Sequence, residues 1–184
     1  HTLSAMAGMR LFFAGGNAID AAVAAGLVEG VVNPHMHTLG GEVPMLIYSA
    51  RERRVVAING NTMAPRGATI EAFRRRGLAL IPGQGVLAAG VPAACDAWLT
   101  ALGRYGTKSL AEVLAPALEL AEDGFPAHRG MWEYPGYGIG AHQARFRDEG
   151  PTTAALYLPE GRLPREGEIL RNPALAGMFR RLIT

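Results

Sequence analysis

The feature that most constrains the fold is a capped, apolar helix near the start of the chain. Two glycines lead into Asn17, whose side-chain oxygen suits an N-cap, and Asp20 stands at the third helical position, where the acid of a capping box belongs. From Ala18 to Val32 the only charged residues are Asp20 and Glu29. A helix that is apolar on all sides is a core helix, so the sequence predicts that other elements surround it.

The other elements are predicted from hydrophobic period, capping residues and turn residues. Pro116 should kink or split its helix, because a proline removes a backbone donor and clashes with the preceding turn. In the first helix, the candidate buried positions are Leu3, Met6, Ala7, Met9 and Phe13. The expected helices cover Leu3–Phe13, 69–76, Val91–Leu102, Leu110–Glu122 and Pro173–Arg181, and the expected hairpin strands cover Met45–Ser49 and Val55–Asn59.

The part of the chain after residue 126 has weaker patterning. Residues 127–150 are rich in Gly, His, Tyr and Arg with no sustained period, which indicates a surface segment with at most short helical pieces. Short extended pieces are expected at Leu156–Leu158 and Gly167–Leu170. No internal repeat and no clear domain boundary is evident, and the abrupt end at Thr184 is expected to be a truncation.

Composition limits the class of protein. With 184 residues, 49% hydrophobic, 18% charged and a net charge of +2, the chain is expected to be globular and to bind no nucleic acid. The basic run Arg74–Arg76 is expected to be a solvated face at the end of a short helix. No stretch reaches the roughly 20 apolar residues of a membrane span. The chain holds no recognisable signal peptide, which leaves the compartment open between cytoplasm and periplasm.

Several kinds of site are not supported by the sequence. His35, His37 and Glu42 form the only cluster that resembles a metal site, and without a third ligand fixed by spacing they are expected to be turn residues; no metal or cofactor is predicted. The glycines before Val91 lack the Lys and Ser or Thr of a phosphate loop. No serine has a nucleophile-elbow context. The single Cys95 excludes an internal disulfide and is expected to be a buried, inert thiol.

A series of short motifs gives the chain a family resemblance. In order, they are Gly15-Gly16-Asn17-Ala18-Ile19-Asp20-Ala21-Ala22, Pro34-His35, Leu39-Gly40-Gly41, Met63-Ala64-Pro65, Ala89-Gly90-Val91-Pro92, Arg104-Tyr105-Gly106-Thr107 and Leu118 to Phe125. The order and content resemble the N-terminal part of the gamma-glutamyltranspeptidase family. Each motif alone is weak, but together they cover most of the chain, and the resemblance is expected to extend beyond Phe125 to its end.

The resemblance implies an α+β fold, the four-layer α-β-β-α sandwich of the N-terminal nucleophile hydrolases, of which residues 1–184 supply an incomplete part of the large subunit. In that family a precursor cuts itself, and the new N-terminal threonine of the small subunit attacks a gamma-glutamyl amide, passing the acyl group to water or an amine. This chain is expected to hold no catalytic residue and to be inactive alone. Its implied partners are the downstream polypeptide with that threonine and a small acyl amide.

The resemblance also locates the acyl-binding residues. Two positions before the Met63-Ala64-Pro65 tripeptide the family has an arginine that holds the substrate's alpha-carboxylate, and this chain has Asn61 there. Asn61 and Thr62 are the expected substrate-facing residues, and Arg66 is a candidate substitute for the missing cation. Two alternatives stay open: a related amidohydrolase or acylase with a non-glutamyl substrate, and a non-catalytic scaffold of the same fold.

Overall fold

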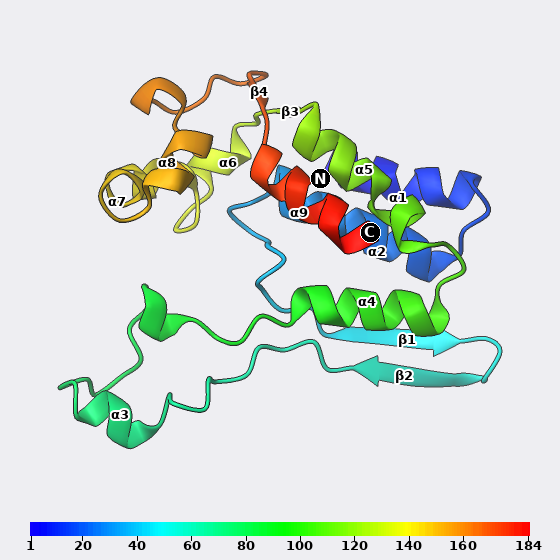
Figure 1. The fold of residues 1–184 in the computed structure, drawn as a ribbon, viewed down its shortest axis with the longest axis horizontal. Helices are drawn as coiled ribbons and strands as arrows, with labels where there is room; N and C mark the ends of the chain where they lie inside the picture. Colours follow the sequence, from blue (N-terminus) through cyan, green and yellow to red (C-terminus); the bar gives the residue numbers. More distant parts are fainter. The chain divides into compact units, whose positions relative to one another are not determined.

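The structure, a computed structural model, describes residues 1–184 as two compact units (Figure 1). The first unit comprises His1–Thr38 and Leu102–Thr184, and the second comprises Leu39–Ala101. The chain is mostly helical with two small antiparallel sheets, so it is an α+β chain. None of its helices combines the length and the apolar character that crossing a bilayer requires.

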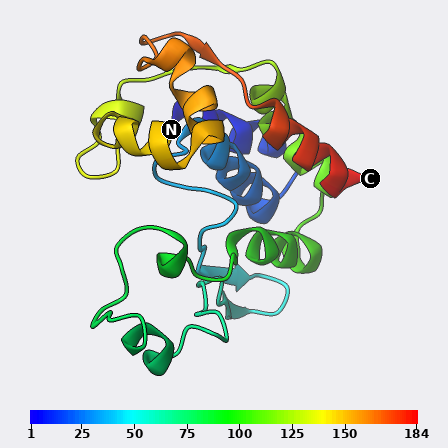
Figure 2. The same cartoon turned by 60° about the vertical axis from the view of Figure 1, so that its left-hand side comes forward.

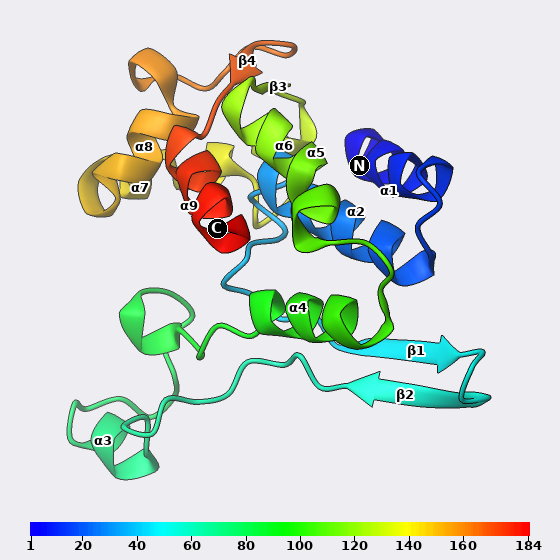
Figure 3. The ribbon, with the colours of Figure 1, turned by 45° about the vertical axis from the view of Figure 1, so that its right-hand side comes forward.

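Four helices form the core of the first unit. They are α1 (Thr2–Phe13), α2 (Ala18–Val32), α5 (Leu110–Glu122) and α9 (Pro173–Ile183). Helix α2 packs against α1 and α5, and α9 lies along α5 (Figures 1 and 3). Val23, Ala24 and Val28 of α2 are essentially inaccessible to solvent. The prediction of a core helix over Ala18–Val32 is therefore confirmed.

The capping box of α2 also has the predicted form. The Asn17 Oδ1 atom accepts hydrogen bonds from the backbone N–H groups of Ile19 (2.8 Å) and Asp20 (3.1 Å). The Asp20 carboxylate accepts from the Asn17 N–H at 2.7 Å. Asn17 Nδ2 donates to the Tyr105 carbonyl oxygen at 2.7 Å, which ties the start of α2 to the segment that leads into α5.

The buried face of α1 differs from the prediction. Met6, Met9 and Phe13 are exposed, and Phe13 retains 85% of its accessible surface, while Leu3 is half-buried. Ala7 is buried as predicted, but the other buried positions are Ser4, Gly8 and Leu11, because α1 lies close to α2. A Cβ on Gly8 would stand 3.2 Å from the Ala21 carbonyl oxygen. The buried residues of α1 are Ser4, Ala7, Gly8 and Leu11.

The remaining elements of the first unit are short. As expected, residues 127–150 contain only short helical pieces. The extended piece expected at Leu156–Leu158 is wrong, because Pro151 starts a helix there. Pro116 was predicted to kink or split its helix, and α5 is not split, because it continues through a buried Pro116. The elements are β3 (Phe125–Pro126), α6 (Gly130–Glu133), η2 (Ile139–His142), α7 (Gln143–Glu149), α8 (Pro151–Tyr157), η3 (Pro159–Gly161) and β4 (Ile169–Leu170), the last pairing with β3.

The second unit contains one hairpin, two short helical turns and most of α4. Strands β1 (Met45–Ser49) and β2 (Arg54–Ile58) pair antiparallel, with β2 one residue earlier than predicted. After β2 the chain makes a wide loop through α3 (Ile70–Arg74) and η1 (Val86–Ala88) before it enters α4 (Ala94–Tyr105) (Figure 2).

The predicted start of α4 at Val91 is wrong. The N–H groups of Ala93 and Ala94 donate to the Gly41 carbonyl oxygen at 3.2 and 2.9 Å, so the chain is still bound to that loop and turns into a helix only afterwards. Pro92 therefore precedes the helix instead of starting it. The helix also continues past the predicted end at Leu102, to Tyr105.

The two faces of the hairpin differ in burial. Ile47 and Ser49 of β1 are buried on one face. On the other face, Leu46 and Tyr48 retain 79% and 66% of their accessible surface, and Val55, which pairs with Tyr48, retains 61%. Since side chains alternate along a strand, the exposed apolar residues lie together on one side of the sheet. We refer to Leu46, Tyr48 and Val55 as the open hairpin face.

Candidate functional site

The predicted substrate-facing residues lie where three segments of the second unit meet. Backbone hydrogen bonds join the Val43 N–H to the Gly60 carbonyl oxygen at 2.9 Å and the Val91 N–H to the Met63 carbonyl oxygen at 2.8 Å. The second of these belongs to an antiparallel bridge between Met63 and Val91. The segment that carries Asn61 and Thr62 is therefore held on both sides by backbone pairing.

Two glycines allow this close approach. A Cβ on Gly60 would stand 2.1 Å from the Val43 carbonyl oxygen and 2.7 Å from the Ala97 Cβ. A Cβ on Gly90 would stand 2.7 Å from the Thr62 Cβ and 2.9 Å from its Oγ1. Neither position has room for a larger residue, so both glycines help to set the position of Thr62.

The polar side chains at this junction carry a single charge, and it is negative. Asn61 is exposed, and its Nδ2 donates to the Asn59 Oδ1 at 2.7 Å. Glu42 Oε2 accepts from the backbone N–H and from the Oγ1 of Thr62, both at 3.3 Å. Glu42 forms no salt bridge. We refer to Glu42, Asn59, Asn61 and Thr62 as the Asn61 corner.

Arg66 does not join this group by any observed contact. It lies in the turn closed by a hydrogen bond from the Ala68 N–H to the Pro65 carbonyl oxygen at 2.8 Å, and its exposed side chain makes no hydrogen bond or ion pair. Sequence reasoning singled out Asn61 and Thr62 but considered Glu42 only as a metal ligand. The sequence feature that could have indicated this junction of backbone segments is the pair of glycines at 60 and 90, which lie close to Thr62.

The histidines considered as metal ligands lie in the first unit. The His35 ring lies 6.0 Å from the His128 ring and 5.8 Å from the Tyr134 ring. Burial lowers the pKa of His35 and the neighbouring His128 lowers it further, while burial also lowers the pKa of His37. The chain contains no group of three or more His, Cys, Asp or Glu residues arranged to hold a metal ion.

Cys95 is a free, half-buried thiol on α4. Burial raises its pKa, and the neighbouring Asp96 raises it further. A thiol is a nucleophile only as its thiolate, so both effects reduce the reactivity of Cys95.

Comparison with known proteins gives consistent results. The sequence profile described as "Gamma-glutamyltranspeptidase" matches residues 4–184. The chain is 34% identical to the Glutathione hydrolase-like YwrD proenzyme of Bacillus subtilis, over 91% of this chain and 31% of that protein. It is 40% identical to the Acylase ACY 1 proenzyme of a Pseudomonas species, over 68% of this chain and 24% of that protein.

A solved structure also resembles this chain. The structure of cephalosporin acylase from Bacillus halodurans superimposes with a TM-score of 0.88 at 32% identity, covering 98% of this chain and 34% of that one. The chain therefore spans about a third or less of the length of these three relatives.

Proposed function

Because the chain belongs to the gamma-glutamyltranspeptidase family, we propose that residues 1–184 are the N-terminal portion of the large subunit of an N-terminal nucleophile amidohydrolase. In this proposal a threonine on the small subunit attacks a gamma-glutamyl or related acyl amide and forms an acyl-enzyme. Water or an amine then accepts the acyl group. The chain described here contributes one wall of the acyl pocket and no catalytic residue.

The open hairpin face supports the view that the fold is completed by further polypeptide. A two-stranded sheet is marginal alone, and a sheet with apolar residues on both faces is stable when a second layer covers each face. Leu46, Tyr48 and Val55 lack such a cover within residues 1–184. In a four-layer α-β-β-α sandwich, the second sheet would pack on this face.

The observation that carries the proposed acyl site is the Asn61 corner. Asn61 and Thr62 are held at a backbone junction, and their side chains belong to a polar surface. We propose that these two residues face the acyl group. Arg66, with no partner of its own, remains a candidate to bind a carboxylate from the neighbouring turn.

A second candidate function is an acylase with a non-glutamyl substrate, and the charge of the Asn61 corner favours it. A neutral amide at position 61 cannot form the ion pair that an arginine would form with a carboxylate. Loss of one partner of such a buried pair costs about 2–5 kcal/mol, which corresponds to more than about a tenfold loss of affinity. The nearby Glu42 carboxylate repels an anionic substituent further.

The experiment uses the complete precursor that contains this chain, purified after self-cleavage. It is assayed on a gamma-glutamyl anilide and on non-glutamyl acyl amides, each with and without a dipeptide acceptor. Turnover of either substrate class supports the amidohydrolase, and the ratio between them separates the two candidates. A precursor that stays uncut and turns over neither class would be a scaffold, which would contradict the proposal.

A further inference from the structure

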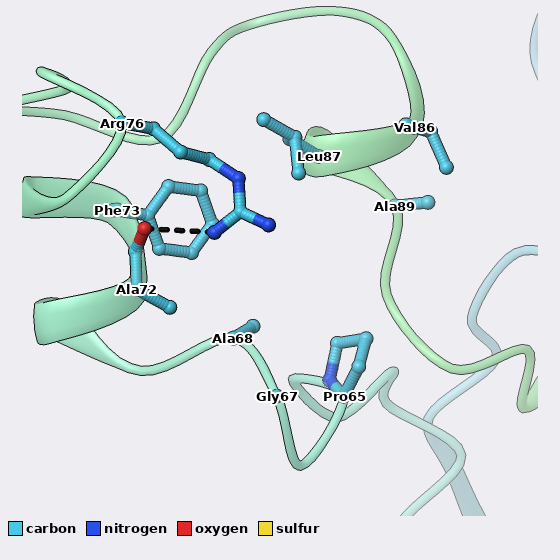
Figure 4. A pocket seen from close by; sticks show the side chains of 9 residues that line it. All are labelled: Pro65, Gly67, Ala68, Ala72, Phe73, Arg76, Val86, Leu87 and Ala89. Atoms are coloured by element: carbon cyan, nitrogen blue, oxygen red, sulfur yellow. Dashed lines mark hydrogen bonds between the residues drawn. The ribbon is translucent and has the colours of Figure 1, made fainter.

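A small cavity lies in the wide loop between β2 and α4. It has a volume of about 220 Å³, and Figure 4 shows that its walls come from the turn after Met63, from α3 and from η1. This volume is well above what one water molecule needs, and a short organic molecule fits in it. Most of the lining side chains are apolar, including Pro65, Phe73 and Leu87.

One cation enters this apolar cavity. Figure 4 shows the Arg76 guanidinium reaching into the space between Phe73 and Leu87. Its Nη1 donates to the Ala72 carbonyl oxygen at 2.8 Å, which fixes the side chain over the end of α3. Arg76 forms no salt bridge with a carboxylate, so the other N–H groups of its planar fork remain available.

Arg76 is therefore distinguished from the rest of the basic run Arg74–Arg76. The sequence predicts this run to be a solvated face, and the hydrogen bond to Ala72 agrees with a role at the helix end. Of the three arginines, however, Arg76 alone lines the cavity. A guanidinium fork matches the geometry of a carboxylate, and the apolar walls suit a hydrocarbon chain.

We propose that this cavity binds a small monocarboxylate with a short apolar chain. The carboxylate accepts hydrogen bonds from the Arg76 guanidinium, and the chain lies against Phe73 and Leu87. This inference is independent of the proposed acyl transfer, because it uses neither the Asn61 corner nor a threonine nucleophile. The three residues that would hold the ligand, Phe73, Arg76 and Leu87, lie outside the family motifs.

The test titrates the complete protein with hexanoate and with hexanol, each followed by ligand-observed NMR. Hexanoate is expected to bind in the millimolar range and about tenfold more tightly than hexanol, since only the carboxylate pairs with Arg76. Arg76→Gln should weaken hexanoate about tenfold and leave hexanol unchanged. Arg75→Gln, which removes the same charge from a neighbour outside the cavity, should bind hexanoate as the unmodified protein does.

A second variant tests the cavity without changing its charge. Ala68→Leu places a larger side chain in the lining and should reduce hexanoate binding while Arg76 is kept. Circular dichroism is used to check that each variant is folded. Equal affinity for hexanoate and hexanol, unchanged binding in Arg76→Gln or in Ala68→Leu, or no hexanoate binding at millimolar concentrations would each overturn the proposal. All these measurements are of binding, so their outcome is separate from whether the enzyme turns over an acyl amide.

Discussion

Each unit contains a carboxylate bound to a threonine, and the two pairs differ in their surroundings. In the first unit, buried Asp20 accepts from the N–H of Thr107 at 2.8 Å and from its Oγ1 at 2.6 Å, and it also accepts from the N–H groups of Asn17 and Lys108. In the second unit, exposed Glu42 makes the same two contacts to Thr62, but at 3.3 Å. The first carboxylate is saturated and structural, whereas the second keeps capacity for another partner.

Removal of each carboxylate gives the largest expected difference between the two units. Asp20→Ala leaves three part-buried backbone donors without a partner, each at the lower end of the usual cost of about 1–3 kcal/mol, so we expect a loss of about 3–5 kcal/mol in the free energy of unfolding. Glu42→Ala should stay within about 0.5 kcal/mol, because the group is exposed. Urea unfolding of the complete protein measures both. Equal effects would show that the two pairs do not differ as described.

The backbone junction of the second unit is tested by Gly60→Ala. The added methyl group would overlap the Val43 carbonyl oxygen, so we expect a loss of about 1–3 kcal/mol and a disturbed Asn61 corner. Gly83→Ala is the matched control, since a Cβ there meets nothing within 4 Å. The control should stay within about 0.5 kcal/mol. A Gly60→Ala protein as stable as the control would mean that the close approach at this junction is absent.

The pH dependence of stability distinguishes a saturated carboxylate from an unsaturated one. Burial alone would raise the pKa of Asp20, but the hydrogen bonds from Thr107, Asn17 and Lys108 outweigh it, so the pKa lies below its ordinary value. The stabilisation by Asp20 is therefore complete above its unfolded pKa, near 3.9, and is lost as the pH falls through the lowered folded pKa. Urea midpoints measured from neutral to acid pH should fall less for Asp20→Asn than for the unmodified protein. If the urea midpoints of the two proteins fell equally with pH, Asp20 would not be a cause of the loss of stability in acid.

The smallest expected effect concerns a third carboxylate, Glu168, which has a cation beside it, unlike Asp20 and Glu42. Glu168 accepts from Arg162 Nη1 and Nη2 at 2.8 and 3.0 Å and from the Arg165 N–H at 2.8 Å. The hydrogen bond to Arg162 is the main reason that the pKa of Glu168 falls to about 2. NMR titration of Arg162→Gln should show this pKa returning toward the ordinary glutamate value of about 4.3. A pKa that does not move would exclude the Arg162 contact as its cause.

The sequence predicted correctly those parts of the fold that depend on interactions between residues close together in the chain. The cap at Asn17, the apolar helix that follows it and the turn of the hairpin depend on residues close in the chain. The buried face of α1 was mispredicted, because helix packing selected the small Gly8 instead of the larger Met6. The wrong start of α4 has a similar origin, since its first N–H groups bind Gly41, which is distant in sequence.

The candidate site could be predicted only in part, and for the same reason. Asn61 and Thr62 follow from their place before the Met63-Ala64-Pro65 tripeptide in a family resemblance. The neighbouring Glu42 does not, because it reaches Thr62 only through backbone pairing of Val43 with Gly60. The sequence alone does not reveal that pairing, so it could not assign the negative charge next to Thr62.

The most direct test of the account is the substrate selectivity of Asn61→Arg in the complete, self-cleaved protein. The measured quantity is the ratio of kcat/KM for a gamma-glutamyl anilide to kcat/KM for the 4-aminobutyryl anilide, which lacks only the alpha-carboxylate. If residue 61 faces the acyl group, the new arginine should raise this ratio more than about tenfold over the unmodified protein. An unchanged ratio in a folded, self-cleaved variant would contradict the placement of Asn61 in the acyl site.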